Sequence, residues 1–163
     1  MRNTSQVGLI SHTAVLNRLV QLGFEVLLPW ADHLGYDLAY FITEEHRNFG
    51  FFAHQESRLV RIQVKTARLS QDGTYLEFNT ASTVSARKGN RKNGYDGRAE
   101  YFAVYNLDLN KVYMLPVAGA PRNTCNLRFK EAGMLRGNRH KTWHEPYSEE
   151  IAHSAYWAED YEL

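Results

Sequence analysis

The stretch RLVRIQVKTA (residues 58–67) constrains the fold of this chain more than any other part of the sequence, because apolar and polar residues alternate along it. Such alternation predicts a half-buried β-strand. One face of that strand is polar and carries Gln63 and Lys65, so that an amide and an ammonium group point the same way. The apolar face carries only core-forming side chains, from Val60, Ile62 and Val64.

A second alternating stretch, GYDLAYF (residues 35–41), also predicts a strand, with Asp37 on the face opposite to Leu38. If the two strands pair, Asp37 can lie beside Gln63 and Lys65. Carboxylate and amide oxygens are hard ligands of the kind that Mg²⁺ accepts. A neighbouring lysine can orient or deprotonate a water and offset the charge that develops on a phosphate. These groups are the smallest set needed for metal-dependent hydrolysis of a phosphodiester.

A less specific interpretation of the same residues stays open. An Asp ahead of a strand often caps a turn, and polar residues on one face of a half-buried strand are usually in contact with solvent. Other chemistries find no support in the sequence. The seven histidines are scattered without a His-Glu-x-x-His motif, and no glycine-rich phosphate-binding loop is present.

The length and composition indicate one soluble globular domain, since the chain has 163 residues, of which 44% are hydrophobic and 23% charged. The single cysteine, Cys125, cannot form an internal disulfide. The N-terminus has no apolar signal core, and no run approaches the ~20 apolar residues of a membrane span. We therefore expect a cytoplasmic, nucleoid-associated protein without a membrane partner.

Charge is distributed unevenly, although the net charge is only +1. Residues 87–98 hold five basic residues and one acid, residues 122–141 hold six and one, and residues 142–163 hold six acids and no Lys or Arg. This segregation predicts a basic face for a polyanion. Residues 81–98 indicate a long, mobile, basic loop, for which a solvated surface excursion is the alternative. We expect the loop to contact DNA through Arg87, Lys88, Arg91, Lys92, Tyr95 and Arg98.

The rest of the pattern predicts an α+β chain with one central sheet. A helix is expected from an N-cap at Thr4 or Ser5 to about Leu22, where Gly23 ends it. His12 lies on its inward face, either as a core-edge histidine bonded to a backbone carbonyl or as a site ligand or DNA contact. The apolar side of the helix comprises Leu9, Val15, Leu16, Leu19, Val20 and Leu22. Further strands are expected at residues 24–28, 74–80, 100–107, 112–117 and 126–129, a turn or loop at 44–50, and a final helix at 144–157.

Taken together, several pieces of the sequence resemble the PD-(D/E)XK nuclease superfamily, above all its group I intron-encoded homing endonucleases and the archaeal-resolvase-like endonucleases. The resemblance implies an α/β/α-type fold, with a central mixed sheet and an αβββαβ restriction-endonuclease-like core over about residues 5–130. It also implies a single domain over residues 1–163, which ends in a helical extension at about 144–163. The pieces that carry the resemblance are GFEVLLP (23–29), GYDL (35–38), RIQVKTA (61–67), EYFAVY (100–105) and VYMLPV (112–117).

Carried over by position, the resemblance implies DNA cleavage with a divalent metal, Mg²⁺ or Mn²⁺. Asp37 matches the first metal-binding acid, and Lys65 matches the lysine of the motif. Gln63 stands where many relatives have Asp or Glu, and Gln is the form found in the homing branch. The Val64 backbone carbonyl completes the implied metal ligands. Relatives often place a Glu on the first helix, where this sequence has His12, which we expect to modulate the metal or contact DNA.

These inferences lead to one leading hypothesis and two alternatives. The leading hypothesis is a divalent-metal-dependent DNA endonuclease, homing-endonuclease- or junction-resolvase-like, that hydrolyses backbone phosphodiesters of double-stranded or branched DNA. Because one active site cuts one strand, we expect a homodimer or homotetramer. The alternatives are a catalytically weakened DNA-binding protein of the same fold and a small oligomeric protein-binding module.

Overall fold

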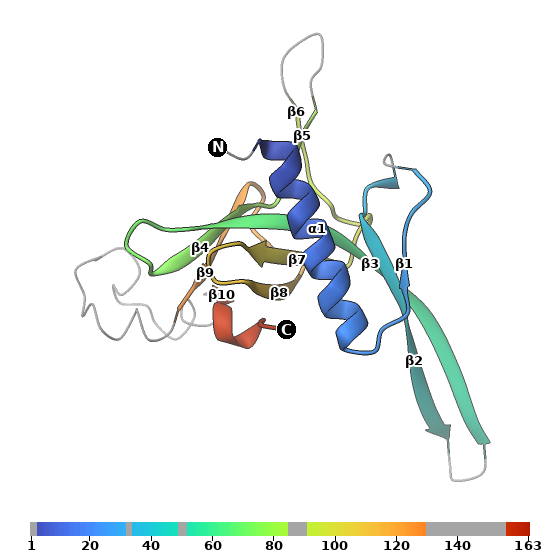
Figure 1. Ribbon diagram of the computed structural model, residues 1–163. Coiled ribbons are helices and arrows are strands. Elements are labelled where there is room, and N and C mark those ends of the chain that lie inside the picture. The colour runs from blue at the N-terminus through green and yellow to red at the C-terminus, as the bar shows by residue number, and fades with distance from the viewer. Residues whose placement is uncertain (1–2, 32–33, 49–51, 85–90, 130–155) are drawn as a thin grey trace.

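The computed structural model describes residues 3–31, 34–48, 52–84, 91–129 and 156–163, and these residues form an α+β fold around a mixed sheet (Figure 1). The predicted fold class and the central mixed sheet are confirmed. In the described part of the chain, β5 and β6 form a separate two-stranded ladder, while the other eight strands form the main sheet. The elements are α1 (Thr4–Gln21), β1 (Val26–Leu27), β2 (Leu38–Asn48), β3 (Phe52–Leu69), β4 (Tyr75–Asn79), β5 (Ser82–Val84), β6 (Arg91–Asn93), β7 (Tyr101–Asn106), β8 (Lys111–Pro116), β9 (Thr124–Arg128), β10 (Tyr156–Trp157) and the 3-10 helix η2 (Ala158–Asp160).

Helix α1 lies where the sequence predicts it, but its N-cap differs. The cap is Asn3, and not Thr4 or Ser5: its side chain accepts a hydrogen bond from the Gln6 N–H at 2.7 Å, and the Gln6 side chain accepts one from the Asn3 N–H. The predicted end is confirmed, because Gly23 follows the helix in the left-handed conformation, with φ +86°.

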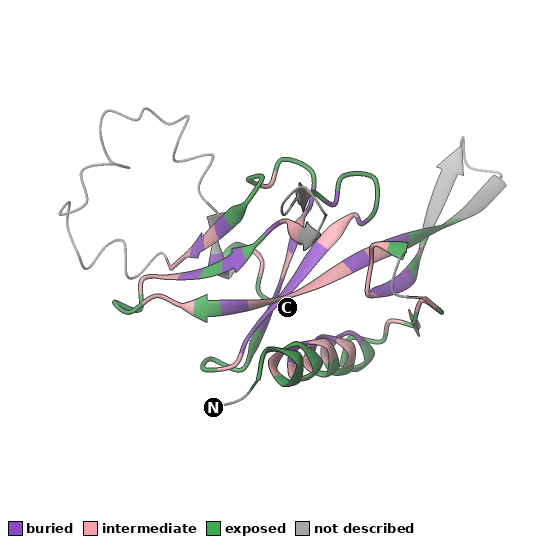
Figure 2. Ribbon diagram, turned by 90° about the horizontal axis from the view of Figure 1, so that it is seen from above, coloured by how far each residue is buried: buried purple, intermediate pink, exposed green. Residues whose placement is uncertain are grey.

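Helix α1 buries only a narrow stripe of its surface, on the side that faces the sheet (Figure 2). Val15 and Leu19 are fully buried, whereas Leu9, Val20 and Leu22 are 68%, 55% and 44% exposed. The prediction that these three residues belong to the packed side of the helix was wrong. Among the described elements, the helix contacts β1, β3, β7 and β8 of the main sheet, and these three apolar side chains remain largely in solvent.

Strand β3 joins the parts of the main sheet. It pairs antiparallel with β2 over residues 52–62, parallel with β7 over residues 62–67, and antiparallel with β4 over residues 68–69. The two alternating stretches of the sequence therefore do pair with each other. Helix α1 is fixed to β3 by the buried Ser11 hydroxyl, which lies 2.6 Å from the Thr66 hydroxyl.

Two buried clusters cover the two faces of the central strands. Strand β7 contributes to both, since Ala103 and Tyr105 belong to one cluster and Phe102 and Val104 to the other. The continuous apolar run of β7 predicts this double burial, which is confirmed. The helix-side cluster consists of Val15, Leu19, Leu38, Tyr40, Val60, Ile62, Ala103, Tyr105 and Val112. The strand-side cluster is centred on Leu76, Phe78, Phe102, Val104, Tyr113, Leu115, Cys125 and Leu127.

Two segments predicted as loops form strands instead. Residues 44–48 continue β2 and pair with residues 52–56, so that a long hairpin projects from the body of the fold (Figure 1). Residues 82–84 and 91–93 pair as β5 and β6 within the predicted basic loop. Backbone ladder bonds do not depend on side-chain polarity, which is why polar composition misled both predictions. The described residues between β4 and β7 form the β5–β6 ladder and a turn, and none of them is α-helical.

The end of the chain adds strand residues to the sheet. Of the helix predicted over residues 144–157, positions 144–155 lie outside the described residues, and Tyr156–Trp157 form β10, parallel to β9. The strand predicted at residues 126–129 as a short edge strand is β9, which is not an edge because it lies between β4 and β10. Among the helices that the structure describes, none has the length and apolar character of a membrane span.

Candidate active site

Asp37 lies at the point where β2 begins and meets the middle of β3. Its backbone N–H donates to the Ile62 carbonyl at 2.8 Å, which sets Asp37 opposite Gln63. The carboxylate oxygen Oδ2 accepts a hydrogen bond from the Val64 backbone N–H at 2.8 Å and another from the Gln63 side-chain amide. Two residues that the sequence predicts as neighbours, Asp37 and Gln63, are therefore in direct contact.

The environment of Asp37 pulls its pKa in two directions. Burial raises the pKa of the carboxyl above its ordinary value of 3.8. The Val64 N–H, the positive charges at His12 and Lys65, and the Gln63 amide lower it, but they do not cancel the effect of burial. The site thus holds a partly desolvated carboxylate whose charge is incompletely balanced by the protein.

The Gln63 amide occupies the centre of this group of atoms. Its nitrogen donates to the Asp37 carboxylate and also lies 3.4 Å from the Val64 carbonyl oxygen. A group that carries partial positive charge therefore sits between two oxygens that suit a cation. A half-turn of the amide would exchange its nitrogen for a third hard oxygen.

This donor set fits a divalent ion. Mg²⁺ is typically bound by one or two carboxylates, keeps several waters and accepts neutral oxygens, and Asp37, the Gln63 side-chain oxygen and the Val64 carbonyl are ligands of these kinds. Within the described ranges, no cluster of three or more His, Cys, Asp or Glu side chains offers another metal site.

Lys65 lies on the same face of β3 as Gln63, and aromatic rings hold its ammonium group. The Lys65 Nζ donates to the Tyr95 hydroxyl at 2.9 Å and lies 4.2 Å from the centroid of the Tyr95 ring. The Phe102 ring centroid is 5.9 Å away. Because the charge of Lys65 lowers the pKa of Asp37, the ammonium acts on the carboxylate of the candidate metal site.

His12 reaches the site from α1. Its Nε2 lies 3.4 Å from the backbone carbonyl oxygen of Asp37, and the side chain is half-buried. This contact matches the first interpretation drawn from the sequence, a core-edge histidine bonded to a backbone carbonyl, and the carbonyl is that of Asp37. The role of His12 as a site ligand or DNA contact stays a prediction. The charge of His12 also lowers the pKa of the Asp37 carboxyl.

Of the predicted DNA contacts, Arg98 packs against Gly35, which lies two residues before Asp37 in the sequence. A Cβ on Gly35 would lie 2.9 Å from Arg98 Cδ, so the exposed arginine packs on the backbone two residues before Asp37. Tyr95 is only 8% exposed and turns toward Lys65, which leaves little of it for DNA. Arg87 and Lys88 lie outside the described residues, and the structure describes the backbone of Arg91 and Lys92 in β6.

Sequence reasoning missed the ion pair between Arg61 and Glu100. Glu100 accepts hydrogen bonds from the Arg61 backbone N–H at 2.6 Å and from the guanidinium Nε at 3.1 Å. These bonds lower the pKa of Glu100 and tie the start of β7 to β3. The signal in the sequence was an acid at the head of an apolar strand, Glu100, and a base on the polar side of another strand, Arg61.

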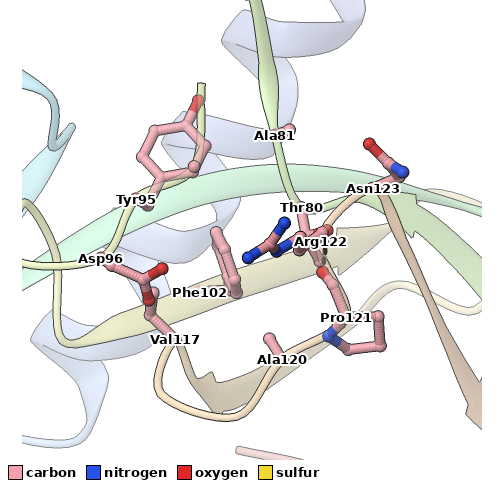
Figure 3. Close-up of a pocket in the computed structure, with 11 residues that line it drawn as sticks. Thr80, Ala81, Tyr95, Asp96, Phe102, Val117, Ala120, Pro121, Arg122 and Asn123 are labelled. Atoms are coloured by element: carbon pink, nitrogen blue, oxygen red, sulfur yellow. Dashed lines mark hydrogen bonds between the residues drawn. The ribbon is translucent and has the colours of Figure 1, made fainter. Parts of the chain in front are cut away.

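A pocket of about 500 Å³ opens beside the aromatic rings and not over Asp37. Tyr95 and Phe102 line it, together with Arg122, whose guanidinium points toward Phe102 (Figure 3). Asp37, Gln63 and Lys65 are not among its lining residues. The pocket is therefore separate from the candidate metal site, although Tyr95 both lines the pocket and contacts Lys65.

The fold is of the restriction-endonuclease-like class, with an acid at the start of one strand and a Gln-x-Lys pair on the strand beside it. The family model described as PD-(D/E)XK endonuclease matches residues 2–150. The chain belongs to the PD-(D/E)XK endonuclease family, which confirms the resemblance found in the sequence. Membership in this family implies DNA as the substrate, and such nucleases generally use divalent metal ions.

A solved structure supports the same fold. The bacterial homing endonuclease I-Ssp6803I superposes with a TM-score of 0.61 at 19% sequence identity, over 94% of this chain and 99% of that chain. At this identity the similarity speaks for a shared fold alone. Comparison with curated proteins gives no match.

Proposed function

We propose that this chain is a divalent-metal-dependent DNA endonuclease that hydrolyses backbone phosphodiesters, with Mg²⁺ or Mn²⁺ as its metal. The observation that carries the proposal is the convergence of Asp37, Gln63 and the Val64 carbonyl on one point, with Lys65 on the same face of β3. The endonuclease family of the chain supports the reaction type.

Each residue of the site has a part in this reaction. Asp37, Gln63 and the Val64 carbonyl would hold the cation, which supplies positive charge to the phosphate and a bound water as nucleophile. Lys65 orients the water and donates to phosphate oxygens on which charge develops. The water oxygen bonds to phosphorus as one P–O ester bond breaks, and a proton from the water ends on the released oxygen. His12 steadies the backbone of Asp37.

Basic residues on one side of the site would hold the DNA. Arg98 is exposed next to Gly35, and the β5–β6 ladder that carries Arg91 and Lys92 projects from the body of the fold (Figure 1). With Arg87 and Lys88 between those strands in sequence, we expect this segment to contact phosphates, with an affinity that falls as salt rises. The substrate is either a specific duplex site, as the neighbour I-Ssp6803I suggests by its description as a homing endonuclease, or a branched junction.

Cleavage of both strands needs more than one copy of this site, so we expect a homodimer or homotetramer. An apolar pair on the projecting hairpin supports assembly. Phe41 and Leu59 are cross-strand partners in β2 and β3, and they are 52% and 39% exposed. If further apolar side chains extend this pair into a contiguous patch, it would mark a contact between copies.

The decisive experiment is cleavage of supercoiled plasmid and of branched DNA with Mg²⁺ and with Mn²⁺, for the wild type and Lys65→Ala. We expect metal-dependent nicking that Lys65→Ala abolishes while DNA binding in a gel-shift assay is retained. Lys111→Ala is the matched control, because Lys111 pairs with Glu162 on the surface and its side chain is 48% exposed. Equal loss of cleavage and binding in Lys65→Ala would count against a catalytic lysine.

A second candidate is a catalytically weakened DNA-binding protein of the same fold. It is favoured by the small charge of the site, in which Asp37 is the single carboxylate bonded to Gln63 and Val64. Tight, salt-sensitive binding without cleavage in either metal would support this candidate. The next variant would then be His12→Glu, which places a second carboxylate next to Asp37.

A further inference from the structure

Lys65 is a long, flexible side chain, and a nuclease needs its ammonium in one place. Lysine has several freely rotating bonds and a strongly hydrated head group. Here the head group is held by the Tyr95 hydroxyl at 2.9 Å and by the face of the same ring at 4.2 Å from its centroid. A single side chain thus provides both the hydrogen-bond acceptor and the π-face that stabilise the ammonium.

The Tyr95 ring is itself fixed from behind. It packs at right angles to Phe102, with ring centroids 5.6 Å apart and an interplanar angle of 87°. Phe102 in turn packs against Phe78, with centroids 5.8 Å apart. Edge-to-face contacts of this kind restrict ring orientation. The backbone is also held, because the Tyr95 carbonyl accepts from the Arg98 N–H at 2.9 Å and from the Ala99 N–H at 3.2 Å.

We propose that Tyr95 is a positioning residue for Lys65, which holds the ammonium at the edge of the candidate active site. This inference rests on the proposed catalytic part of Lys65. An ammonium group has three N–H donors, and the Tyr95 hydroxyl uses one of them. Two donors stay available for a water and a phosphate oxygen, so the contact orients the group without blocking it.

The contact also joins two parts of the proposed nuclease. Tyr95 lies two residues after β6 and three residues before Arg98, within the segment expected to bind DNA. The turn after β6 therefore places the Arg98 side chain beside Gly35 and the Tyr95 hydroxyl against the Lys65 ammonium. Tyr95 was predicted as a DNA contact, whereas its buried ring supports a role inside the site.

The contact can be tested without any cleavage assay. The full chain is treated with limiting acetic anhydride, and the rate of Lys65 acetylation is measured by peptide mass spectrometry, with Lys111 as the internal reference. We expect the rate to rise roughly tenfold in Tyr95→Leu, which removes both the ring face and the hydroxyl. In Tyr95→Phe the ring face stays, so the rate should rise by a smaller factor. Tyr95→Phe also keeps the test valid if Tyr95→Leu does not fold.

The role in the reaction is tested by single-turnover cleavage with the same variants. We expect the cleavage rate to fall roughly tenfold in Tyr95→Leu and less in Tyr95→Phe, while the Kd for DNA is unchanged. Tyr105→Phe is the matched control, because Tyr105 is also buried and its hydroxyl bonds to Asn110 and not to Lys65. A structural effect common to buried tyrosines would appear in the control as well.

The outcomes separate this inference from the proposed function. An unchanged rate of Lys65 acetylation in both Tyr95 variants would overturn the contact. Faster acetylation with unchanged cleavage would overturn the positioning role. If the wild type does not cleave DNA, the proposed function fails, and the acetylation series still decides whether Tyr95 holds Lys65.

Discussion

The two faces of β3 are held in different ways. On the helix side, Val60 and Ile62 are fully buried in the helix-side cluster. On the site face, three successive side chains each have a polar partner: Arg61 pairs with Glu100, Gln63 with Asp37, and Lys65 with Tyr95. Apolar packing has no preferred direction, whereas each hydrogen bond fixes one atom against another. One face of the strand thus supplies stability, and the other supplies the geometry of the chemistry.

The largest expected effect on stability comes from the helix side. We expect Ile62→Ala to lower the free energy of unfolding by about 2–5 kcal/mol, because it leaves a cavity in the helix-side cluster. Ile62→Val should cost only about 0.5–1.5 kcal/mol. Urea denaturation followed by circular dichroism measures both. If the alanine variant were as stable as the wild type, the claim that the helix-side face of β3 supplies most of the stability would be wrong.

On the site face, Asp37→Asn should act in the opposite sense on stability and activity. We expect cleavage to fall by at least about 100-fold, as when a group that stabilises transition-state charge is removed. The midpoint of thermal unfolding at neutral pH should rise, since an amide keeps an acceptor for Val64 and Gln63 without a desolvated charge. A lower midpoint of thermal unfolding together with full cleavage activity would contradict the assignment of Asp37 to the chemistry of the site face.

The same variant has a defined pH dependence. The pKa of Asp37 in the folded protein lies above its ordinary value of 3.8, so the folded protein binds this proton more tightly than the unfolded chain does. The contribution of the Asp37 carboxyl to the stability of the folded protein is therefore fully present below pH 3.8. It is lost as the pH rises through the pKa of Asp37 in the folded protein. We expect the stability difference between Asp37→Asn and the wild type to shrink in acid, as thermal unfolding in metal-free buffer would measure.

A smaller effect is expected from Gln63→Glu, which places a second carboxylate against Asp37. Without metal the variant should unfold at a lower temperature, because like charges lie in contact. With Mg²⁺ the order should reverse, with roughly tenfold tighter binding, which corresponds to about 1.4 kcal/mol. A titration of the unfolding midpoint with Mg²⁺ measures this. Gln21→Glu adds the same charge at an exposed position of α1 and should leave Mg²⁺ affinity unchanged.

The smallest effect is expected at Arg98, which lies beside the site without contacting Asp37. Arg98→Ala should weaken DNA binding at low salt and reduce the slope of log Kd against log salt by about one, as for one lost phosphate contact. Fluorescence anisotropy at several salt concentrations gives this slope. An unchanged slope would remove Arg98 from the DNA-binding surface.

Local alternation explains what the sequence could predict. The period-two pattern of residues 35–41 and 58–67 marks which side of each strand is buried. The pattern places Asp37 and Gln63 on the same face once β2 pairs with β3, and that pairing comes from the structure.

Other features depend on information that a periodic pattern does not contain. The contact between Lys65 and Tyr95 requires the polar segment after β6 to fold back onto β3, and no periodicity in the sequence predicts that packing. The cap at Asn3 was missed because Ser, Thr and Asn suit this position about equally.

The pairing of β3 also sets the order in which the site can assemble. Its ladder with β2 closes a local hairpin, whereas its ladder with β7 joins Gln63 to Phe102, across a much longer loop. Loop closure costs more entropy as the loop lengthens. We therefore expect the hairpin that brings Asp37 to Gln63 to form before the ladder between β3 and β7. Pulse-labelled hydrogen exchange would detect protection of the Asp37 amide before that of the β7 amides, and the reverse order would contradict this sequence of events.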